Sequence, residues 1–124
     1  MSDGHPIGAV AERVGLDSDT LRDYERRGIL PCPARDGTGR RRYTDSDIHL
    51  IEVLLHLKET GMPLADIADF TRYAAADPDG VPERLRILRE HRLRIRAKRR
   101  ELDDALVLVD RKISDYMRRP PAAP

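Results

Sequence analysis

The sequence predicts a mainly α-helical fold, with an arginine-rich hairpin in its N-terminal third and one long helix at its C-terminus. Three observations support this prediction. Apolar residues recur at spacings of three and four along most of the chain, as they do on the buried face of a helix. Glycines and prolines interrupt the pattern where helices would end. The apolar residues are mainly Leu, Ile, Val and Ala, with no Trp and a single Phe, a composition that suits helices.

Size and composition limit the class of protein. A chain of 124 residues allows one compact core and one further element. Its only cysteine, Cys32, has no intramolecular partner for a disulfide, and no apolar run is long enough for a signal peptide or a membrane span. We therefore expect a soluble, cytoplasmic protein without membrane association. No catalytic constellation or phosphate-binding glycine loop stands out, so we expect neither an enzyme nor a bound cofactor or metal.

Two short helices are predicted after residues 1–5, which we expect to be frayed. The first begins at Pro6 and ends at Gly15. The residues that share its buried face are Ile7, Val10, Ala11 and Val14. The second covers Thr20 to Arg27, and Gly28 ends it in the left-handed conformation. Two short helices joined by a tight turn match the helix-turn-helix motif, whose second helix enters the major groove of DNA.

Residues 31–44 contain two prolines and two glycines, which excludes a helix. A tip at Gly37-Thr38-Gly39 between short extended arms predicts a small β-hairpin, or wing, whose second arm, Arg40 to Tyr43, is basic. Residues 22–44 hold seven arginines against three acidic residues, a net charge of +4, although the whole chain has a net charge of only +1. The positive charge is therefore concentrated where the motif would meet DNA.

Two further helices follow the wing. Thr44 and Asp47 have the spacing of a capping box at the start of the third helix, which runs to Gly61. The Met-Pro step at 62–63 precedes the fourth helix, which ends before a turn at residues 77–80. The residues of this helix pair that we expect to face the core are Ile48, Leu50, Ile51, Leu54, Leu55, Leu64, Ile67, Ala68 and Phe70.

The longest predicted element is a coiled-coil dimerisation helix over residues 83–117, separate from a DNA-binding domain with its helix pair over residues 6–77. Its apolar residues follow a 3,4,3,4 spacing, with Arg92 and Arg99 at intervening seam positions. These apolar residues are Leu85, Leu88, Ile95, Leu102, Leu106, Val109, Ile113 and Tyr116. A helix with such a stripe draws its stability from packing, so we expect a homodimer. An antiparallel coiled coil fits because the seam arginines can meet acidic residues of the partner, but the sequence leaves the orientation open.

Several phrases in these elements resemble one known family. They are IGAVA at 7–11, TLRDYERRGIL at 20–30, GRRRY at 39–43 and GMPLADI at 61–67. In this order and at these spacings, they resemble the MerR family of bacterial transcription regulators over about residues 6–117. We expect a short form of this family, without an appended effector domain.

The resemblance implies a mechanism. In the family, the winged helix-turn-helix binds a pseudo-palindromic promoter and the long helices form an antiparallel coiled-coil dimer. The bound dimer bends and untwists an overlong spacer, so that RNA polymerase engages both promoter elements. Carried over to this chain, the resemblance and its local departures imply that the residues in contact with DNA are Thr20, Arg22, Tyr24, Arg40, Arg41 and Tyr43.

Two positions depart from the family pattern, Asp23 and Arg40, where many relatives have an aromatic residue. A carboxylate near phosphates is repulsive, whereas an added arginine strengthens backbone binding and steepens its salt dependence. Asp23 lies three and four residues before Arg26 and Arg27, the spacing of intrahelical ion pairs. We interpret Asp23 as the residue that aligns these arginines and sets operator preference, and Glu25 as a structural partner of a neighbouring arginine.

The sequence leaves the effector open. Metal- and redox-responsive relatives use cysteines that this chain lacks, and aldehyde-responsive relatives use a cysteine in the third helix at or near the place of His56. We therefore interpret Cys32 as an inert thiol, and His49 and His56 as too few ligands for a metal site. A small-molecule effector would bind where the helix pair meets the partner's long helix. The residues predicted to line that site are Met62, Phe70, Tyr73 and Tyr116.

Other functions remain open at this point. The chain could be an interaction protein whose coiled coil binds a different partner, with the basic patch incidental, or a ligand-binding module. The arginines between 84 and 100 could form a second nucleic-acid surface, although interspersed acidic residues are more typical of a coiled-coil flank. Salt-dependent, sequence-specific binding to its own upstream DNA would distinguish a regulator from an interaction protein.

Overall fold

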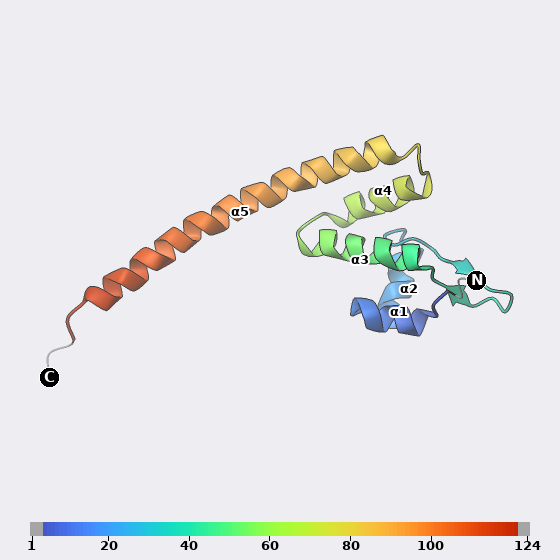
Figure 1. Ribbon diagram of the computed structural model, residues 1–124, viewed down its shortest axis with the longest axis horizontal. Helices are drawn as coiled ribbons and strands as arrows, with labels where there is room; N and C mark the ends of the chain where they lie inside the picture. The colour runs from blue at the N-terminus through green and yellow to red at the C-terminus, as the bar shows by residue number, and fades with distance from the viewer. Residues whose placement is uncertain (1–3, 122–124) are drawn as a thin grey trace. The chain divides into compact units, whose positions relative to one another are not determined.

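The computed structural model describes residues 4–121 and has the predicted mainly helical fold (Figure 1). Over that range, the elements are α1 (Ile7–Val14), α2 (Ser18–Arg26), β1 (Ala34–Arg35), β2 (Arg41–Arg42), α3 (Asp45–Glu59), α4 (Leu64–Ala75) and α5 (Val81–Arg118). The chain divides into two units, one up to Leu88 and one from Arg89 onward, so the division falls within α5.

The helices α1 and α2 form the predicted helix-turn-helix. Gly15 ends α1 with a φ of 77°, in the left-handed region that favours glycine, and its N–H donates to the Ala11 carbonyl. Asp17 caps α2, because its carboxylate accepts a hydrogen bond from the Thr20 backbone N–H at 2.8 Å. Hydrogen bonds from the side chain and backbone of Thr20 hold the pKa of Asp17 below its ordinary value. The turn between the two helices is therefore fixed by local interactions.

The wing is a two-stranded antiparallel sheet whose tip is held by one carboxylate. Asp36 accepts hydrogen bonds from the Thr38 backbone N–H at 2.8 Å, the Thr38 hydroxyl at 2.6 Å and Arg42 Nε at 3.1 Å. These bonds, chiefly the one from the Thr38 side chain, hold the pKa of Asp36 well below its ordinary value. Gly39 has a φ of 80°. The predicted tip at residues 37–39 is therefore confirmed.

The N-terminal segment adds a further bridge to the wing. The backbones of His5 and Tyr43 exchange hydrogen bonds of 2.7 and 2.9 Å. The His5 ring also lies 2.9 Å from the Asp45 carboxylate. The prediction of a frayed segment before Pro6 is therefore wrong for His5, because the edge of the wing offers its backbone partners. Residues 1–3 of that prediction lie outside the described residues.

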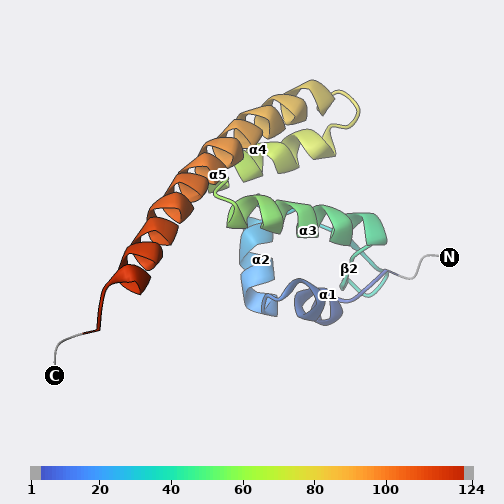
Figure 2. The same ribbon diagram turned by 60° about the vertical axis from the view of Figure 1, so that its left-hand side comes forward.

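The helices α3 and α4 lie side by side, with α1 and α2 on the other side of α3 (Figures 1 and 2). Thr44 and Asp47 form the predicted capping box, in which each side chain accepts from the other's backbone N–H, at 3.0 and 2.9 Å. The buried apolar residues are Val10, Ala11, Leu21, Ile29, Leu30, Tyr43, Ile48, Ile51, Leu54, Met62, Ile67, Phe70 and Ile87. Thr71 joins α4 to the segment after α2, because its hydroxyl donates to the Ile29 carbonyl at 2.6 Å. A single core thus supports both the helix-turn-helix and the wing.

The helix α5 is 38 residues long and begins two residues before its predicted start. Most of its large apolar side chains are exposed, and Leu102 and Leu106 retain 63% and 58% of their surface. Within the described residues, no helix has both the length and the apolar character that a membrane span requires.

Candidate DNA-binding surface

A hollow of about 410 Å³ lies where α2, the wing and the start of α1 come together. The residues that line it are Pro6, Ile7, Arg22, Arg35, Gly39, Arg40 and Arg41, and we call it the arginine hollow. Arg22 comes from α2, Arg35 from β1 and Arg41 from β2, with Arg40 directly before β2. The two segments predicted to bind DNA therefore meet at one basic surface.

The arginines of the hollow are held by different partners. Arg22 Nη1 donates to Asp19 at 3.0 Å on the exposed side of α2. Arg35 Nη1 donates to the Gly39 carbonyl at 2.7 Å, across the wing tip. A guanidinium has five N–H donors, so each of these arginines keeps donors for a further oxygen. Planar arginine forks of this kind suit phosphate oxygens and guanine edges.

A buried carboxylate of α2 is paired with one arginine of the hollow. The Glu25 side chain is only 2% exposed and accepts from Arg41 Nε through Oε2 at 2.8 Å. Its other oxygen, Oε1, accepts from the hydroxyl of Tyr43, which is fully buried. Burial, followed by the hydrogen bond to Glu25, raises the pKa of Tyr43 well above its ordinary value of 10.0. One carboxylate of α2 thus holds two side chains of the wing segment.

The structure brings only some of the predicted contact residues to the hollow. Those that line it are Arg22, Arg40 and Arg41. Thr20 and Tyr24 are half-buried on α2 and are not part of its lining; Tyr24 packs against the core, with Lys58 Nζ 5.8 Å from its ring centroid. The predicted DNA contact of Tyr43 is corrected, because a side chain with no exposed surface cannot reach DNA in this conformation. Tyr43 instead supports the wing from below.

Arg35 was not predicted from the sequence, although a signal for it was present. A hairpin centred on Thr38 places Arg35 opposite Arg41, and the observed register has this pairing. Side chains directly opposite each other in an antiparallel pair lie on the same face. Once Arg41 is assigned to a DNA-facing surface, the hairpin geometry therefore assigns Arg35 to it as well.

The predicted role of Asp23 as an aligner of arginines is confirmed. Its carboxylate lies 3.0 Å from Arg26 Nη2 and 3.6 Å from Arg27 Nη1. These arginines follow Asp23 by three and four residues, the spacing at which side chains of a helix are neighbours. Both arginines are exposed and lie outside the lining of the arginine hollow. Asp23 thus organises the outer side of α2, whereas Glu25 organises its inner side.

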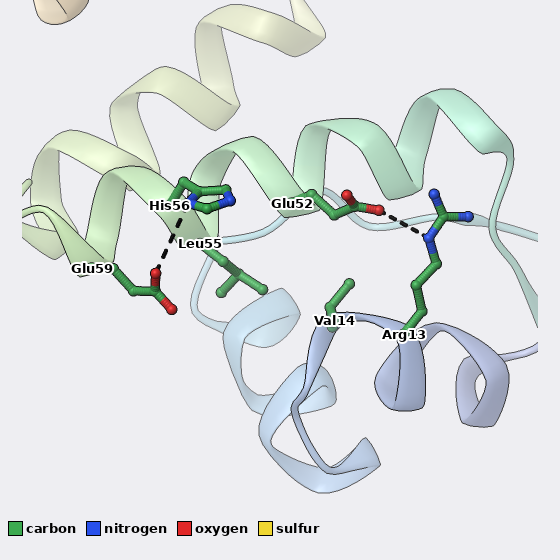
Figure 3. A pocket seen from close by; sticks show the side chains of 6 residues that line it. All are labelled: Arg13, Val14, Glu52, Leu55, His56 and Glu59. Atoms are coloured by element: carbon green, nitrogen blue, oxygen red, sulfur yellow. Dashed lines mark ion pairs between the residues drawn. The ribbon is translucent and has the colours of Figure 1, made fainter.

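A smaller hollow of about 180 Å³ lies between α1 and α3 (Figure 3). Its lining residues are Arg13, Val14, Glu52, Leu55, His56 and Glu59. Arg13 Nε lies 3.0 Å from Glu52 Oε1, and His56 Nδ1 lies 3.9 Å from Glu59 Oε2. His56 is thus paired with a carboxylate of its own helix. Across residues 4–121, no group of three His, Cys, Asp or Glu side chains could hold a metal ion.

The predicted effector-binding residues differ in their surroundings. Met62 and Phe70 are 3% and 6% exposed and belong to the core, and Tyr73 is half-buried against it. Tyr116 is 57% exposed and lies in the second unit. A site that combines these residues stays a prediction.

Comparison with known proteins identifies the family. The family described as "MerR HTH family regulatory protein" matches residues 6–74, and the one described as "MerR, DNA binding" matches residues 48–113. The uncharacterised HTH-type transcriptional regulator YyaN of Bacillus subtilis (strain 168) is 35% identical over 124 residues, covering 90% of each chain. An uncharacterised HTH-type transcriptional regulator of Haemophilus influenzae is 35% identical over 108 residues, covering 87% of this chain and 80% of the relative.

Solved structures agree with this result. HiNmlR, a MerR family regulator lacking the sensor domain and crystallised bound to promoter DNA, has a TM-score of 0.80 and 33% identity, covering 92% of this chain and 90% of its own. A solved protein from Listeria monocytogenes shares the fold, with a TM-score of 0.84 and 24% identity, covering 92% of this chain and 86% of its own. Sequence and fold therefore agree along nearly the whole chain. The chain belongs to the MerR family and is a helix-turn-helix transcriptional regulator of MerR type.

Proposed function

We propose that this regulator binds promoter DNA as a homodimer and that the arginine hollow holds the DNA backbone. The observation that carries the proposal is the convergence of Arg22 of α2 with Arg35, Arg40 and Arg41 of the wing segment. Phosphate contacts from arginine fix the register and orientation of a protein on the duplex. A similar protein, HiNmlR, has been solved bound to promoter DNA, which supports this use of the surface.

The residues of the surface have different roles in this proposal. Arg35, Arg40 and Arg41 bind phosphates on the wing side, and Arg22 binds a phosphate or a guanine edge at the start of the groove. Thr20 and Tyr24, elsewhere on α2, remain proposed contacts of the recognition helix. Tyr43, which the sequence placed among the DNA contacts, supports the wing instead.

The apolar stripe of α5 supports the homodimer. The heptad residues of α5 between Leu85 and Tyr116 are each 37–63% exposed in the single chain. An apolar surface of this length is typical of a protein–protein interface, and a two-fold dimer covers the same stripe on both copies. In our proposal, two α5 helices pair as an antiparallel coiled coil, and residues 6–77 act as the DNA-binding domain with its helix pair.

A two-fold dimer presents two arginine hollows, which matches a pseudo-palindromic promoter with two half-sites. Distorting the spacer between the half-sites costs about 1–6 kcal/mol, which phosphate contacts can offset. The distorted promoter would then be engaged by RNA polymerase, and a small-molecule effector could shift this balance. A coiled-coil interaction protein with an incidental basic patch is not favoured, because the family is one of transcriptional regulators.

The test is a binding assay with the DNA upstream of the protein's own gene, at several salt concentrations. We expect two protected half-sites in a footprint and much weaker binding to random DNA of equal length. Arg40→Ala should weaken binding to all sequences and reduce the slope of log affinity against log salt by about 0.9. Arg72→Ala is the matched control, since Arg72 is an exposed arginine of α4 outside the arginine hollow. Equal affinity for upstream and random DNA would contradict the proposal.

A further inference from the structure

Glu25 has an environment that is unusual for a glutamate. It lies on the DNA-binding helix, in a chain segment dominated by arginines, yet its side chain is only 2% exposed. Buried glutamates are rare in proteins unless their charge is paired and hydrogen-bonded. Here both carboxylate oxygens have a partner, Arg41 Nε on one and the Tyr43 hydroxyl on the other. Both partners are distant in sequence and belong to the wing segment.

The contact with Glu25 determines which part of Arg41 remains available. Nε of Arg41 donates to Glu25 at 2.8 Å, so Glu25 binds the guanidinium through the nitrogen nearest the aliphatic part of the side chain. Within residues 4–121, the Arg41 side chain makes no other hydrogen bond or ion pair. Its two terminal amino groups are therefore unengaged, and the residue lines the arginine hollow. The Arg41 side chain is only 20% exposed, much less than the 43% of Arg22.

We propose that Glu25 is a positioning residue for DNA binding, which acts by holding Arg41 with its terminal amino groups turned toward a backbone phosphate. The inference rests on the proposed use of the arginine hollow. A free arginine side chain has many rotamers, and it loses this freedom when it binds a phosphate. The hydrogen bond to Glu25 restricts the rotamers of Arg41 before DNA binds. The second hydrogen bond of Glu25, from Tyr43, holds the residue that follows β2 against α2.

A competing effect acts in the opposite direction. A carboxylate repels phosphates, so removing Glu25 would also relieve a repulsion. Two features limit this repulsion. The negative charge of Glu25 is neutralised by Arg41 at 2.8 Å, and three further arginines, Arg22, Arg35 and Arg40, line the arginine hollow together with Arg41. We therefore expect the positioning effect to outweigh the repulsion.

The test needs a variant that frees Arg41 without leaving the buried Tyr43 hydroxyl unpaired. Glu25→Leu alone would leave the buried Tyr43 hydroxyl without its partner and could unfold the domain. The double variant E25L/Y43F replaces the Glu25 carboxylate and the Tyr43 hydroxyl together by apolar groups of similar volume, so that neither is left without the other. Circular dichroism and urea unfolding of this background establish that it is folded.

The measurement is the effect of Arg41→Ala on affinity for upstream DNA in the two backgrounds. With Glu25 and Tyr43 present, Arg41→Ala should weaken binding roughly tenfold and lower the salt slope by about 0.9. In the E25L/Y43F background, the salt slope should already be lowered, and Arg41→Ala should change affinity less than about twofold. Glu25→Gln, which keeps an oxygen acceptor for Arg41 Nε, should retain most of the Arg41 effect.

The outcomes separate this inference from the proposed function. If Arg41→Ala has the same effect on affinity and salt slope in both backgrounds, Glu25 only stabilises the fold and the positioning role is wrong. If the protein with all its residues unchanged shows no preference for upstream DNA, the proposed function fails and the positioning role fails with it. If the unsubstituted protein prefers upstream DNA and Arg41→Ala no longer changes affinity in the double variant, both the proposed function and the positioning role of Glu25 are supported.

Discussion

Two carboxylates two residues apart on α2 have opposite surroundings. The Asp23 side chain is 44% exposed and pairs with arginines of its own helix, whereas the Glu25 side chain is 2% exposed and pairs across to the wing. Positions i and i+2 of a helix point in different directions, so one residue faces solvent and the next-but-one faces the core. Because an exposed ion pair contributes little free energy and a buried one is strongly coupled to its partners, the two residues affect different properties. Asp23 modulates the surface and Glu25 holds the structure of the site.

The hydroxyl of Tyr43 makes a pH-dependent contribution to stability. Burial and the Glu25 carboxylate raise the pKa of Tyr43 above 10.0 in the folded protein, so the folded state holds this proton more tightly than the unfolded chain does. The stability that the Tyr43 hydroxyl contributes is therefore fully present below the pKa that Tyr43 has in the unfolded chain. It is lost as pH rises toward the higher pKa that Tyr43 has in the folded protein. At neutral pH, Tyr43→Phe should lower the free energy of unfolding by about 1.5–3 kcal/mol, because a hydrogen bond to a charged group is lost.

Urea unfolding between roughly pH 8 and pH 11 checks this expectation. The unsubstituted protein should lose stability over the upper part of that range more steeply than Tyr43→Phe. Tyr116→Phe is the control, since the Tyr116 side chain is 57% exposed and has no buried carboxylate as a partner. Parallel pH profiles for Tyr43→Phe and the unsubstituted protein would mean that Tyr43 does not stay protonated in the folded state.

At the scale of whole elements, the sequence predicted what is encoded locally. The caps of α1 and α3 were found because each depends on residues within four positions, such as Gly15 or the Thr44 and Asp47 pair. Contacts between distant segments carried no such signal. The bridge between His5 and Tyr43 and the hydrogen bond of Thr71 to the segment after α2 depend on the packed core. The burial of Tyr43 was missed for the same reason.

The turn between α4 and α5 depends on the absence of a side chain at Gly80. A Cβ atom at this position would lie 1.9 Å from the Tyr73 carbonyl oxygen, a backbone atom that cannot move independently. Gly80→Ala should therefore separate the end of α4 from the start of α5 and lower the free energy of unfolding by about 1–3 kcal/mol. Urea unfolding of the two proteins gives this difference directly.

The matched control for Gly80 is Gly8, in the exposed face of α1. A Cβ atom at Gly8 would meet no heavy atom within 4 Å. Gly8→Ala should raise the free energy of unfolding by about 0.5–1 kcal/mol, because alanine loses less backbone freedom than glycine in a helix. The same substitution is thus expected to have opposite signs at the two sites. A loss of stability at Gly8 as large as that at Gly80 would show that the close approach to Tyr73 is not the cause.

At the scale of the whole molecule, charge and hydrophobicity are divided between separate parts of the chain. The arginine hollow belongs to the first unit, and most of the exposed apolar stripe belongs to α5 beyond Leu88. The heptad spacing predicted this stripe from the sequence alone, because a repeat of 3 and 4 is visible without any tertiary contact. The convergence of Arg22 with Arg35 was not visible in this way, since it depends on how the wing packs against α2. The sequence therefore predicted the apolar stripe of α5 more completely than the arginine hollow.

Two leucines of α5 test whether the stripe is the dimer interface. Leu106 occupies a seam position of the heptad pattern, whereas Leu108, two residues further on, lies on the other side of the helix. Their side chains are exposed to similar extents in the single chain, 58% and 64%. Exposure alone therefore does not distinguish them, and a difference between their glutamate variants would report on the seam itself.

Leu106→Glu should convert the dimer to a monomer at concentrations where the unsubstituted protein is dimeric. Each copy loses the burial of a leucine, about 1.5–3 kcal/mol, and gains a charge that the seam would have to desolvate. Analytical ultracentrifugation checks the mass, and circular dichroism checks that the first unit stays folded. Leu108→Glu should remain a dimer. In the proposed function, both copies of the dimer bind one pseudo-palindromic promoter, so Leu106→Glu should also lose most of its affinity for upstream DNA. A single half-site should be bound by this variant as weakly as by a DNA-binding domain acting alone. If Leu108→Glu dissociates and Leu106→Glu does not, the dimer forms through the opposite face of α5, and the heptad assignment has to be abandoned.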